Sequence, residues 1–447
     1  MKVNQVHSTI GKHLPVGADS IVVDLEKSQG AYLHDSVTGR DYIDFFSFFA
    51  SAPVGHNHPK MHDADFIEKL LSVAITKVSS SDFYTTYMAD FVDTFARVAM
   101  PKNMQNLFLI SGGALAVENA LKVAFDWKAR RNFGAIAAHK PGNGQLRIEG
   151  LGSKIIHFEE AFHGRTGYTM TMTNTDDPRK YLYFPKFDWP RVLNPKLRFP
   201  VTDEVLADVQ RAEEIAIAQI EGAVKQYPGE VAGLMIEPIQ GEGGDNHFRP
   251  EFFQELRRLA DEHEFLLMVD EVQSGMGITG KMWCIEHMGV EPDVIAFGKK
   301  AQVCGIIAGP RVREVPGNVF EEASRINSTW GGDLTDMVRS TRFLEIMEQD
   351  KLLDHTAKMG ERVLDGLHTM AAKSKGEISN VRGRGMMVAF DLPDQAARDA
   401  MMDTLKDNGL YALKSGNRAI RFRAMLDTPA EIIDKALDIV EQSAPDG

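Results

Sequence analysis

Short apolar segments alternate with helix-length segments from about residue 64 to residue 320. The apolar segments have the length of strands, and the stretches between them allow helices of ten or more residues. This alternation is typical of parallel strands that form one sheet covered by helices. The predicted strands are 107–110, 154–158, 233–236, 265–270 and 294–297. The predicted fold class is therefore α/β, with a large domain built on a mostly parallel sheet.

The two ends of the chain have a different pattern. Segments at 21–24, 31–34 and 42–46 are short, rich in strand-forming residues and separated by glycines. After about residue 333, two helical stretches precede predicted strands at 386–392 and 419–423, which indicates a smaller α/β domain. We predict a segment 1–60 that joins the small domain, a large domain 61–325 and a C-terminal small domain 326–447.

Charge and cysteine content limit the partners and the compartment. The 447 residues carry a formal net charge of −13, which disfavours binding to nucleic acid or to anionic lipid. Any anion must therefore be bound by local groups. The chain has two cysteines and no apolar run long enough to span a bilayer, so we expect a cytoplasmic protein.

An acid and an amine are expected at one edge of the predicted sheet. Asp270 ends one strand, and Lys299 and Lys300 follow the next. Parallel strands bring their carboxyl ends to a common edge, where open α/β sheets bind ligands. Pyridoxal 5'-phosphate (PLP) requires a lysine that forms an imine with its aldehyde and a carboxylate that keeps its ring nitrogen protonated. Either group alone would indicate only a capped turn or a solvated strand end.

A second pattern suits a phosphate group. Ser111-Gly112-Gly113 follows a predicted strand and opens a helix predicted from residue 114 to about 130. Bare backbone N–H groups at the start of a helix, beside glycines, can bind an anion. Ser328 and Thr329 precede a glycine pair and another predicted helix, so their hydroxyls suit either a helix cap or a phosphate contact.

Six segments, taken in order, resemble the class III aminotransferase family over nearly the whole chain. They are Ser111-Gly112-Gly113, Phe162-His163-Gly164-Arg165, Glu237-Pro238-Ile239-Gln240-Gly241-Glu242-Gly243, Asp270-Glu271-Val272-Gln273, Lys300 and Ser328-Thr329. The resemblance implies the PLP-dependent transferase fold type I, PLP as cofactor, and a homodimer with shared active sites.

The resemblance also implies a role for each matching residue at the cofactor. Lys300 would form the Schiff base and shuttle a proton, and Asp270 would pair with the pyridinium nitrogen. Lys299 is the rival for this linkage, but the motif alignment places the reactive amine at 300. The other expected cofactor contacts are Phe162 and Val272 on the two ring faces, Gln273 near the ring hydroxyl, Gly112 and Gly113 at the phosphate, and Ser328 with Thr329, of which Thr329 would reach the neighbouring subunit's cofactor.

Two arginines and a glutamate are expected to bind the substrates. By the same resemblance, Arg421 would hold the α-carboxylate of 2-oxoglutarate or glutamate, and Arg165 the distal carboxylate, since a guanidinium matches a carboxylate with two hydrogen bonds. Glu242 would neutralise Arg421 while an ω-amino donor is bound, then swing aside for the dicarboxylate. Asn327 would orient the donor.

Segments outside the cofactor motifs, such as 184–191 and 245–253, resemble the L-lysine 6-aminotransferases within this family. The implied reaction converts L-lysine and 2-oxoglutarate to 2-aminoadipate 6-semialdehyde and glutamate. Ornithine, 4-aminobutyrate or diaminobutyrate stays open as the donor. One departure is Asp333, which stands where these enzymes have asparagine. It adds a negative charge near Ser328 and Thr329, the loop expected to contact the phosphate.

A metal-dependent hydrolase is the alternative from another class of enzyme. It is suggested by His56, His58 and the nearby His62. No matching cluster of acids or histidines occurs elsewhere in the sequence, and related aminotransferases carry a similar loop without metal. We therefore expect no metal.

Overall fold

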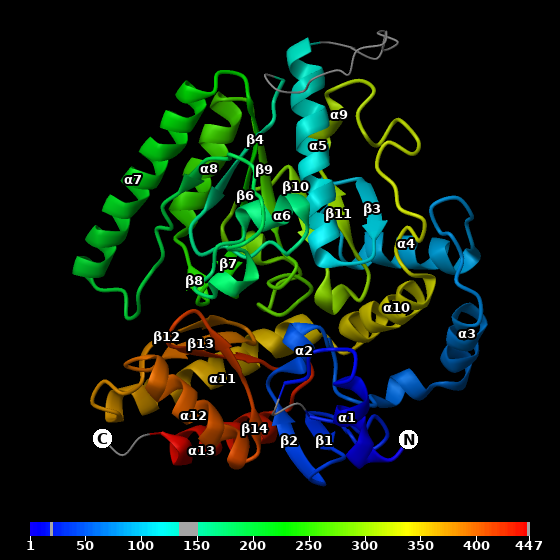
Figure 1. Ribbon diagram of the computed structural model, residues 1–447, viewed down its shortest axis with the longest axis vertical. Helices are drawn as coiled ribbons and strands as arrows, with labels where there is room; N and C mark the ends of the chain where they lie inside the picture. The colour runs from blue at the N-terminus through cyan, green and yellow to red at the C-terminus, as the bar shows by residue number, and fades with distance from the viewer. Residues whose placement is uncertain (18–20, 134–150, 445–447) are drawn as a thin grey trace.

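A computed structural model describes residues 1–17, 21–133 and 151–444 of the chain (Figure 1). Within this part, seven strands form the main sheet, in the order β3-β11-β10-β9-β6-β4-β5. Their bounds are β3 Asn106–Ile110, β11 Cys304–Ala308, β10 Val294–Phe297, β9 Leu266–Asp270, β6 Val231–Ile236, β4 Lys154–Phe158 and β5 Arg191–Val192. All pairs among β10, β9, β6, β4 and β5 are parallel, which confirms the predicted mostly parallel sheet.

The register of the central strands places their ends together. Ala296 of β10 lies opposite Asp270 at the end of β9, so the residues after both strands emerge at one edge of the sheet. Strand β11 runs antiparallel to both β10 and β3. It was not predicted, because Gly305 interrupts its short apolar run and glycine is depleted in strands. It returns the chain from this edge to the opposite side of the sheet.

Alternate residues of the strands belong to two separate cores. Met268, Val294 and Ala296 pack with α5 (Gly113–Phe133), whereas Val269 and Ile295 pack with α8 (Pro250–Glu262). A strand directs successive side chains to opposite faces, so a sheet buried on both faces needs apolar residues at every position. Helix α7 (Asp203–Gln226) also flanks the sheet, as Figure 1 shows.

The small sheet is antiparallel and lies below the main sheet in Figure 1. Its order is β12-β13-β16-β15, with bounds Ser379–Arg384, Met387–Asp391, Ala419–Arg423 and Leu413–Ser415. Helix α11 (Leu352–Lys373) packs against β12 and β13, α12 (Gln395–Asp407) packs against β15 and β16, and α13 (Ala430–Ser443) packs against these two helices. The predicted strands at 386–392 and 419–423 correspond to β13 and β16.

The N-terminal strands pair with the far end of the chain. Strands β1 (Tyr32–Asp35) and β2 (Arg40–Asp44) form a three-stranded sheet with β14 (Leu410–Tyr411), which runs parallel to β2. The predicted strand at 21–24 is wrong, since Val23 forms only an isolated bridge to Asp35. The domain boundaries at residues 60 and 325 stay a prediction.

The remaining elements connect these sheets. Helix α10 (Leu334–Gln349) packs against α3 (Ala64–Ala74) and α4 (Thr86–Val98). No helix of the described residues has the length and apolar character needed to cross a membrane. The other elements are η1 Val3–Gln5, α1 Val6–Ile10, α2 Ser47–Ala50, η2 Pro59–His62, α6 Gly167–Met172, η4 Pro178–Lys180, β7 Ile239–Gln240, β8 Asn246–His247, η5 Cys284–His287, η6 Lys299–Ala301 and α9 Pro310–Arg313.

Candidate active site

Asp270 forms the buried floor of the site at the end of β9. Its Oδ1 accepts a hydrogen bond from the backbone N–H of Val272 at 3.0 Å, and its Oδ2 lies 2.8 Å from Nδ1 of His163. Burial lowers the pKa of His163, but the bond to Asp270 outweighs it, so the net shift is upward. A protonated imidazole that donates to Asp270 helps to keep this carboxylate ionised.

Glu237 adds a second carboxyl group beside this pair. It accepts hydrogen bonds from the backbone N–H groups of Phe162 and Gly241 at 2.9 and 3.1 Å. Burial raises its pKa, and the charge of Asp270 acts in the same direction. Glu237 therefore holds in place the two loops that carry Phe162 and Gly241.

The two adjacent lysines face different surroundings. Burial lowers the pKa of Lys299 to about 8, and Asp270 and Glu237 act on its charge in the opposite direction. Burial lowers the pKa of Lys300 to about 7, and the carboxylates that act on it are Asp44 and Asp427 instead. Asp270 and Glu237 therefore act on the charge of Lys299, whereas Arg423 lowers the pKa of both lysines.

Lys300 is tied to the N-terminal segment. Its Nζ donates to the carbonyl oxygen of Ala52 at 2.8 Å, and Nε2 of Gln302 donates to that of Ser51 at 2.7 Å. The expectation that Lys300 faces Asp270 does not fit this placement. Residue 299 takes a φ of 48°, a left-handed conformation that non-glycine residues seldom adopt and that is common at functional sites.

The start of α5 lies against the turn that carries the lysines. A Cβ on Gly113 would come within 2.8 Å of Cγ1 of Val272, and a Cβ on Gly298 within 3.4 Å of the same atom. Gly112 has a φ of 111°. The glycine turn, Val272 and the residue before Lys299 thus meet at one place, where the first backbone N–H groups of α5 lack partners within the helix.

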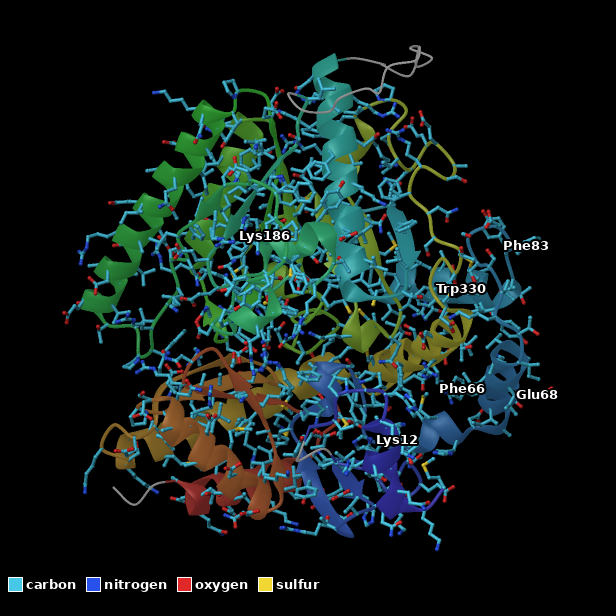
Figure 2. The ribbon with its side chains drawn as sticks, viewed as in Figure 1. Lys12, Phe66, Glu68, Phe83, Lys186 and Trp330 are labelled. Atoms are coloured by element: carbon cyan, nitrogen blue, oxygen red, sulfur yellow. The ribbon has the colours of Figure 1, made fainter. Side chains whose placement is uncertain are left out.

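The segment 327–330 lies at the surface of the chain. Asn327 and Thr329 are exposed, Ser328 is half-buried, and Trp330 is 42% exposed. Trp330 and the exposed Phe83 are labelled on the outer side of the molecule in Figure 2. The carbonyl oxygen of Thr329 accepts a hydrogen bond from the hydroxyl of Ser79 at 2.6 Å, which fixes the backbone of this segment.

The charge of Asp333 is offset locally. Its Oδ1 accepts a hydrogen bond from the backbone N–H of Thr335 at 2.9 Å at the start of α10, and its Oδ2 lies 3.0 Å from Nζ of Lys77. Burial raises the pKa of Asp333, but the partners outweigh it and the net shift is downward. The negative charge expected near the phosphate loop is thus paired within the chain.

Arg421 and Glu242 form an ion pair at the other end of the site. Nη2 of Arg421 donates to Oε2 of Glu242 at 2.7 Å, and Nη1 donates to the carbonyl oxygen of Gly241 at 2.6 Å. Arg421 lies on β16 and is buried, with its Nε unpartnered among the described residues. The other oxygen of Glu242 contacts Nζ of Lys180. Burial raises the pKa of Glu242, but Arg421 and Lys180 outweigh it and lower the pKa.

Gln273 lies between two buried arginines. Its Oε1 accepts hydrogen bonds from Nη1 of Arg421 at 3.3 Å and from Nε of Arg423 at 3.1 Å. Arg423 also contacts the carboxylate of Asp245, and burial lowers its pKa to about 10. The amide group of Gln273 is therefore oriented by its Oε1, which leaves its NH2 group to point elsewhere.

Phe162 connects the floor of the site with two cations. The guanidinium of Arg165 and the ammonium of Lys180 each lie 6.0 Å from the centre of its ring. Arg165 is exposed and Phe162 is half-buried.

The residues present fit PLP. A buried carboxylate with a histidine partner suits a pyridinium nitrogen, and a buried amine with a lowered pKa suits an aldehyde. The bare start of α5, which a Cβ at Gly113 would obstruct, suits a phosphate. The structure brings Asp270, Val272, Gln273, Glu242 and Arg421 together, but it leaves Asn327, Ser328 and Thr329 on the outer surface.

The histidines that suggested a metal hydrolase have other partners. His56 Nε2 lies 2.9 Å from Oδ2 of Asp44, and Nδ1 of His58 accepts a hydrogen bond from the backbone of Lys60 at 3.2 Å. His62 Nε2 lies 3.2 Å from Oδ1 of Asn57. All three partners belong to residues 44–60 of the N-terminal segment.

Three residues of the site were not predicted. His163 and Glu237 stand inside matching motifs but received no role, because a motif does not reveal which side chain meets Asp270. Lys180 lies outside the cofactor motifs and just before the segment 184–191. Only its contact with Glu242 reveals it.

Known proteins share this fold and sequence. The family description Aminotransferase class-III matches residues 13–443. An L-lysine-epsilon aminotransferase of Amycolatopsis lactamdurans is 45% identical over 98% of this chain and 95% of its own length. A solved lysine aminotransferase from M. tuberculosis is 44% identical, covers 99% of both chains and superposes with a TM-score of 0.93. A mitochondrial 4-aminobutyrate aminotransferase of Mus musculus is 33% identical over 90% of this chain and 80% of its own.

The fold, the buried acid with its neighbouring amine, and the glycine turn define a PLP-dependent aminotransferase. The chain belongs to the class III aminotransferase family. This confirms the predicted fold type I and the predicted cofactor.

Proposed function

We propose that this enzyme transfers the terminal amine of L-lysine to 2-oxoglutarate, giving 2-aminoadipate 6-semialdehyde and glutamate. The ion pair between Glu242 and Arg421 is the observation that carries the proposal. A pocket that accepts both an ω-amino donor and a dicarboxylate needs a cation that can be masked and released. The names of the relatives at 44–45% identity support lysine as the donor.

Lys299, rather than Lys300, is proposed as the amine that holds the cofactor. When bound, PLP supplies an aldehyde that takes up amines and a protonated ring that withdraws an electron pair. A reactive amine must first be within reach, and only then does its pKa matter. Asp270 and Glu237 act on Lys299, whereas Lys300 is held by Ala52. With a pKa of about 8, Lys299 can release and accept a proton near neutral pH.

The buried carboxylates and the glycine turn position the cofactor. Asp270, held by His163, would pair with the ring nitrogen, while Phe162 and Val272 would cover the ring faces. Gln273 would contact the ring hydroxyl through its NH2 group, since its oxygen is bound by arginines. Gly112 and Gly113 would hold the phosphate through backbone N–H groups.

Two arginines bind the carboxylates in this proposal. The α-carboxylate of lysine would pair with Arg165 while Glu242 masks Arg421. When 2-oxoglutarate binds, Glu242 leaves and Arg421 takes its α-carboxylate, while Arg165 holds the distal one. Asn327 would orient the donor.

The active form is proposed to be a cytoplasmic homodimer. Ser328 and Thr329 are on the surface of one chain, so they suit a contact with the phosphate bound by a second chain. The exposed aromatic rings of Phe83 and Trp330 support an interface there, because large exposed apolar groups mark contact surfaces.

One experiment tests the donor. Purified enzyme with PLP is offered L-lysine, ornithine or 4-aminobutyrate, each with 2-oxoglutarate, and the carbonyl products are identified by mass spectrometry. We expect the highest kcat/KM for L-lysine and loss of its ε-amino group, seen as a semialdehyde that cyclises to a six-membered imine.

Faster conversion of ornithine or 4-aminobutyrate would show that this substrate, and not lysine, is the preferred donor. The relative named for 4-aminobutyrate, at 33% identity, makes this ω-amine the second candidate. A product that has lost the α-amino group of lysine would contradict transfer of the terminal amine altogether.

A further inference from the structure

We propose that Lys180 is the second ion-pair partner of Glu242 and holds its carboxylate when Glu242 leaves Arg421. We call this exchange of partners the Glu242 switch. Lys180 would thereby set the balance between the ω-amino donor and the dicarboxylate acceptor. This inference rests on the proposed function, since it concerns how one pocket alternates between the two ligands.

The two oxygens of Glu242 are shared between two cations. Oε2 accepts from Nη2 of Arg421 at 2.7 Å, and Oε1 contacts Nζ of Lys180. The side chain of Glu242 is 25% exposed and that of Lys180 is 16% exposed. A carboxylate this buried pays a large desolvation penalty if it loses every cationic partner. Lys180 allows Glu242 to release Arg421 and stay paired.

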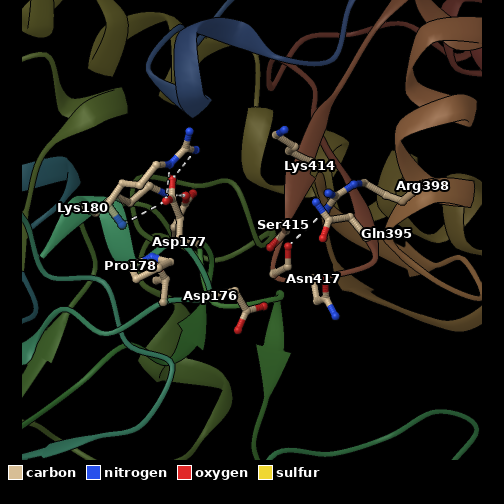
Figure 3. Close-up of a pocket in the computed structure, with 13 residues that line it drawn as sticks. Asp176, Asp177, Pro178, Lys180, Gln395, Arg398, Lys414, Ser415 and Asn417 are labelled. Carbon is tan, nitrogen blue, oxygen red and sulfur yellow. Dashed lines mark hydrogen bonds and ion pairs between the residues drawn. The ribbon is translucent and has the colours of Figure 1, made fainter. Parts of the chain in front are cut away.

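A cavity beside Lys180 provides room for this movement. It has a volume of about 260 Å³, and both Glu242 and Lys180 line it. Figure 3 shows Lys180, Asp177 and Pro178 on one wall and Lys414, Ser415 and Arg398 on the other. The cavity therefore lies between the segment before β5 and the small sheet, next to the ion pair.

The charges around the cavity favour an arriving carboxylate. Its lining includes four basic side chains, Arg179, Lys180, Arg398 and Lys414, and two acids besides Glu242. One of these acids, Asp177, is paired with Arg179 at 2.7 Å and lies 3.9 Å from Lys180. The other, Asp176, has its pKa raised by burial. The net local charge without Glu242 is thus positive.

Lys180 should affect the binding of the dicarboxylate acceptor more than the binding of the amino donor. While lysine is bound, Glu242 stays on Arg421, and Lys180 only supports the pair. When a dicarboxylate binds, Glu242 must move. The free energy needed to separate Glu242 from Arg421 then depends on Lys180. Without Lys180, Glu242 would stay on Arg421 and compete with the dicarboxylate.

The test compares four variants with the wild-type holoenzyme: Lys180→Met, Lys180→Arg, Glu242→Gln and the double variant K180M/E242Q. The dissociation constant of glutarate, an unreactive dicarboxylate, is measured by calorimetry. The two half-reactions are followed by rapid mixing, which separates KM from kcat. We expect Lys180→Met to weaken glutarate binding and raise the KM for 2-oxoglutarate about tenfold, the factor that 1.4 kcal/mol produces.

The controls distinguish a switch from a general effect of charge. Lys180→Arg should restore binding, the donor half-reaction should change several-fold less than the acceptor half-reaction, and Lys180→Met should have no further effect once Glu242 is Gln. Equal loss in both halves, or the same loss with and without Glu242, would overturn the proposal. If the wild-type enzyme binds glutarate but does not convert L-lysine, this result would contradict only the proposed donor and not the role of Lys180.

Discussion

Single side chains decide which amine is reactive. Lys299 and Lys300 are neighbours in the sequence, and burial lowers the pKa of both, to about 8 and about 7. The lower pKa would favour Lys300 as a nucleophile at neutral pH, but its Nζ is bound to the carbonyl of Ala52. In proposing Lys299 we therefore rank position above basicity, because an amine must reach the reacting carbon before its lone pair matters.

The first prediction is that residue 299 carries the cofactor. Wild type, Lys299→Met and Lys300→Met are reduced with borohydride in the presence of PLP, digested and sequenced by mass spectrometry. We expect the modified lysine at 299 in wild type and in Lys300→Met, and none at 300 in Lys299→Met. Modification at 300 in the wild type would contradict the proposal.

A second prediction concerns the pH at which the cofactor-free enzyme takes up PLP. Only the unprotonated amine attacks an aldehyde, and the pKa of Lys299 is lowered to about 8. The uptake rate in wild type should therefore rise as the pH increases towards 8 and level off above it. Lys300→Met should keep this profile, as checked by following the absorbance of the bound cofactor. A midpoint near the ordinary lysine pKa of about 10.4 would indicate an exposed amine instead.

At the scale of elements, the strands that carry the site were predictable and the connections were not. Asp270 and Lys299 each follow a run of apolar residues, and the rule for parallel strands is enough to place them at one edge. The choice between Lys299 and Lys300 was not decidable in this way, because both lie in the turn after β10, where the rule for strands does not give the direction of a side chain. The aligned motif favoured 300, whereas Asp270 and Glu237 act on the charge of Lys299 and the Nζ of Lys300 donates to Ala52.

Two other features had no signal in the sequence. Ser47–Ala50 takes four consecutive positive φ values without a glycine, a left-handed turn that local preferences oppose. Lys180 meets Glu242, which is 62 residues further along the chain, only in the folded structure. Both depend on contacts between distant parts of the chain, which periodicity does not report.

The contact of Gly113 with Val272 yields a third prediction. Gly113→Val would place side-chain atoms where a Cβ already comes within 2.8 Å of Val272 Cγ1, so α5 must shift. We expect PLP affinity to fall about tenfold or more, a cost of at least about 1.4 kcal/mol. Fluorescence titration of the cofactor-free protein measures this.

A matched pair of variants checks the cause. Val272→Ala in the Gly113→Val background should recover part of the affinity, because it removes the clashing methyl groups. Gly222→Ala lies on α7 with open space around its Cβ and should leave PLP affinity unchanged. Equal losses from Gly113→Val and Gly222→Ala would show that the contact with Val272 is unimportant.

At the scale of the whole molecule, the proposed dimer shares its active sites. Sedimentation should give a species of twice the chain mass of 49.7 kDa. The Lys299→Met variant keeps an intact Thr329. The Thr329→Arg variant keeps an intact Lys299, and its arginine blocks the phosphate contact. Refolding an equal mixture of the two should recover about a quarter of the wild-type activity, since half of the dimers are mixed and each has one complete site.

Failure to recover activity in mixed dimers that are shown to form would mean that each chain completes its own site. The same mixture of Lys299→Met with Lys300→Met serves as the control. Lys300→Met should already be active alone, so mixing should only average the two activities.

The pairing of β2 with β14 affects how the enzyme folds while it is being synthesised. The partner of Asp44 is Tyr411, near the other end of the chain, so the first strands leave the ribosome with one edge open. At about 5–20 residues per second, that edge waits roughly 20–70 s for its neighbour to be synthesised. The carbonyl of Ala52 that receives Lys300 lies just beyond these strands. The three-stranded sheet and the ion pair of Glu242 with Arg421 can therefore form only after residues 410–423 have been synthesised.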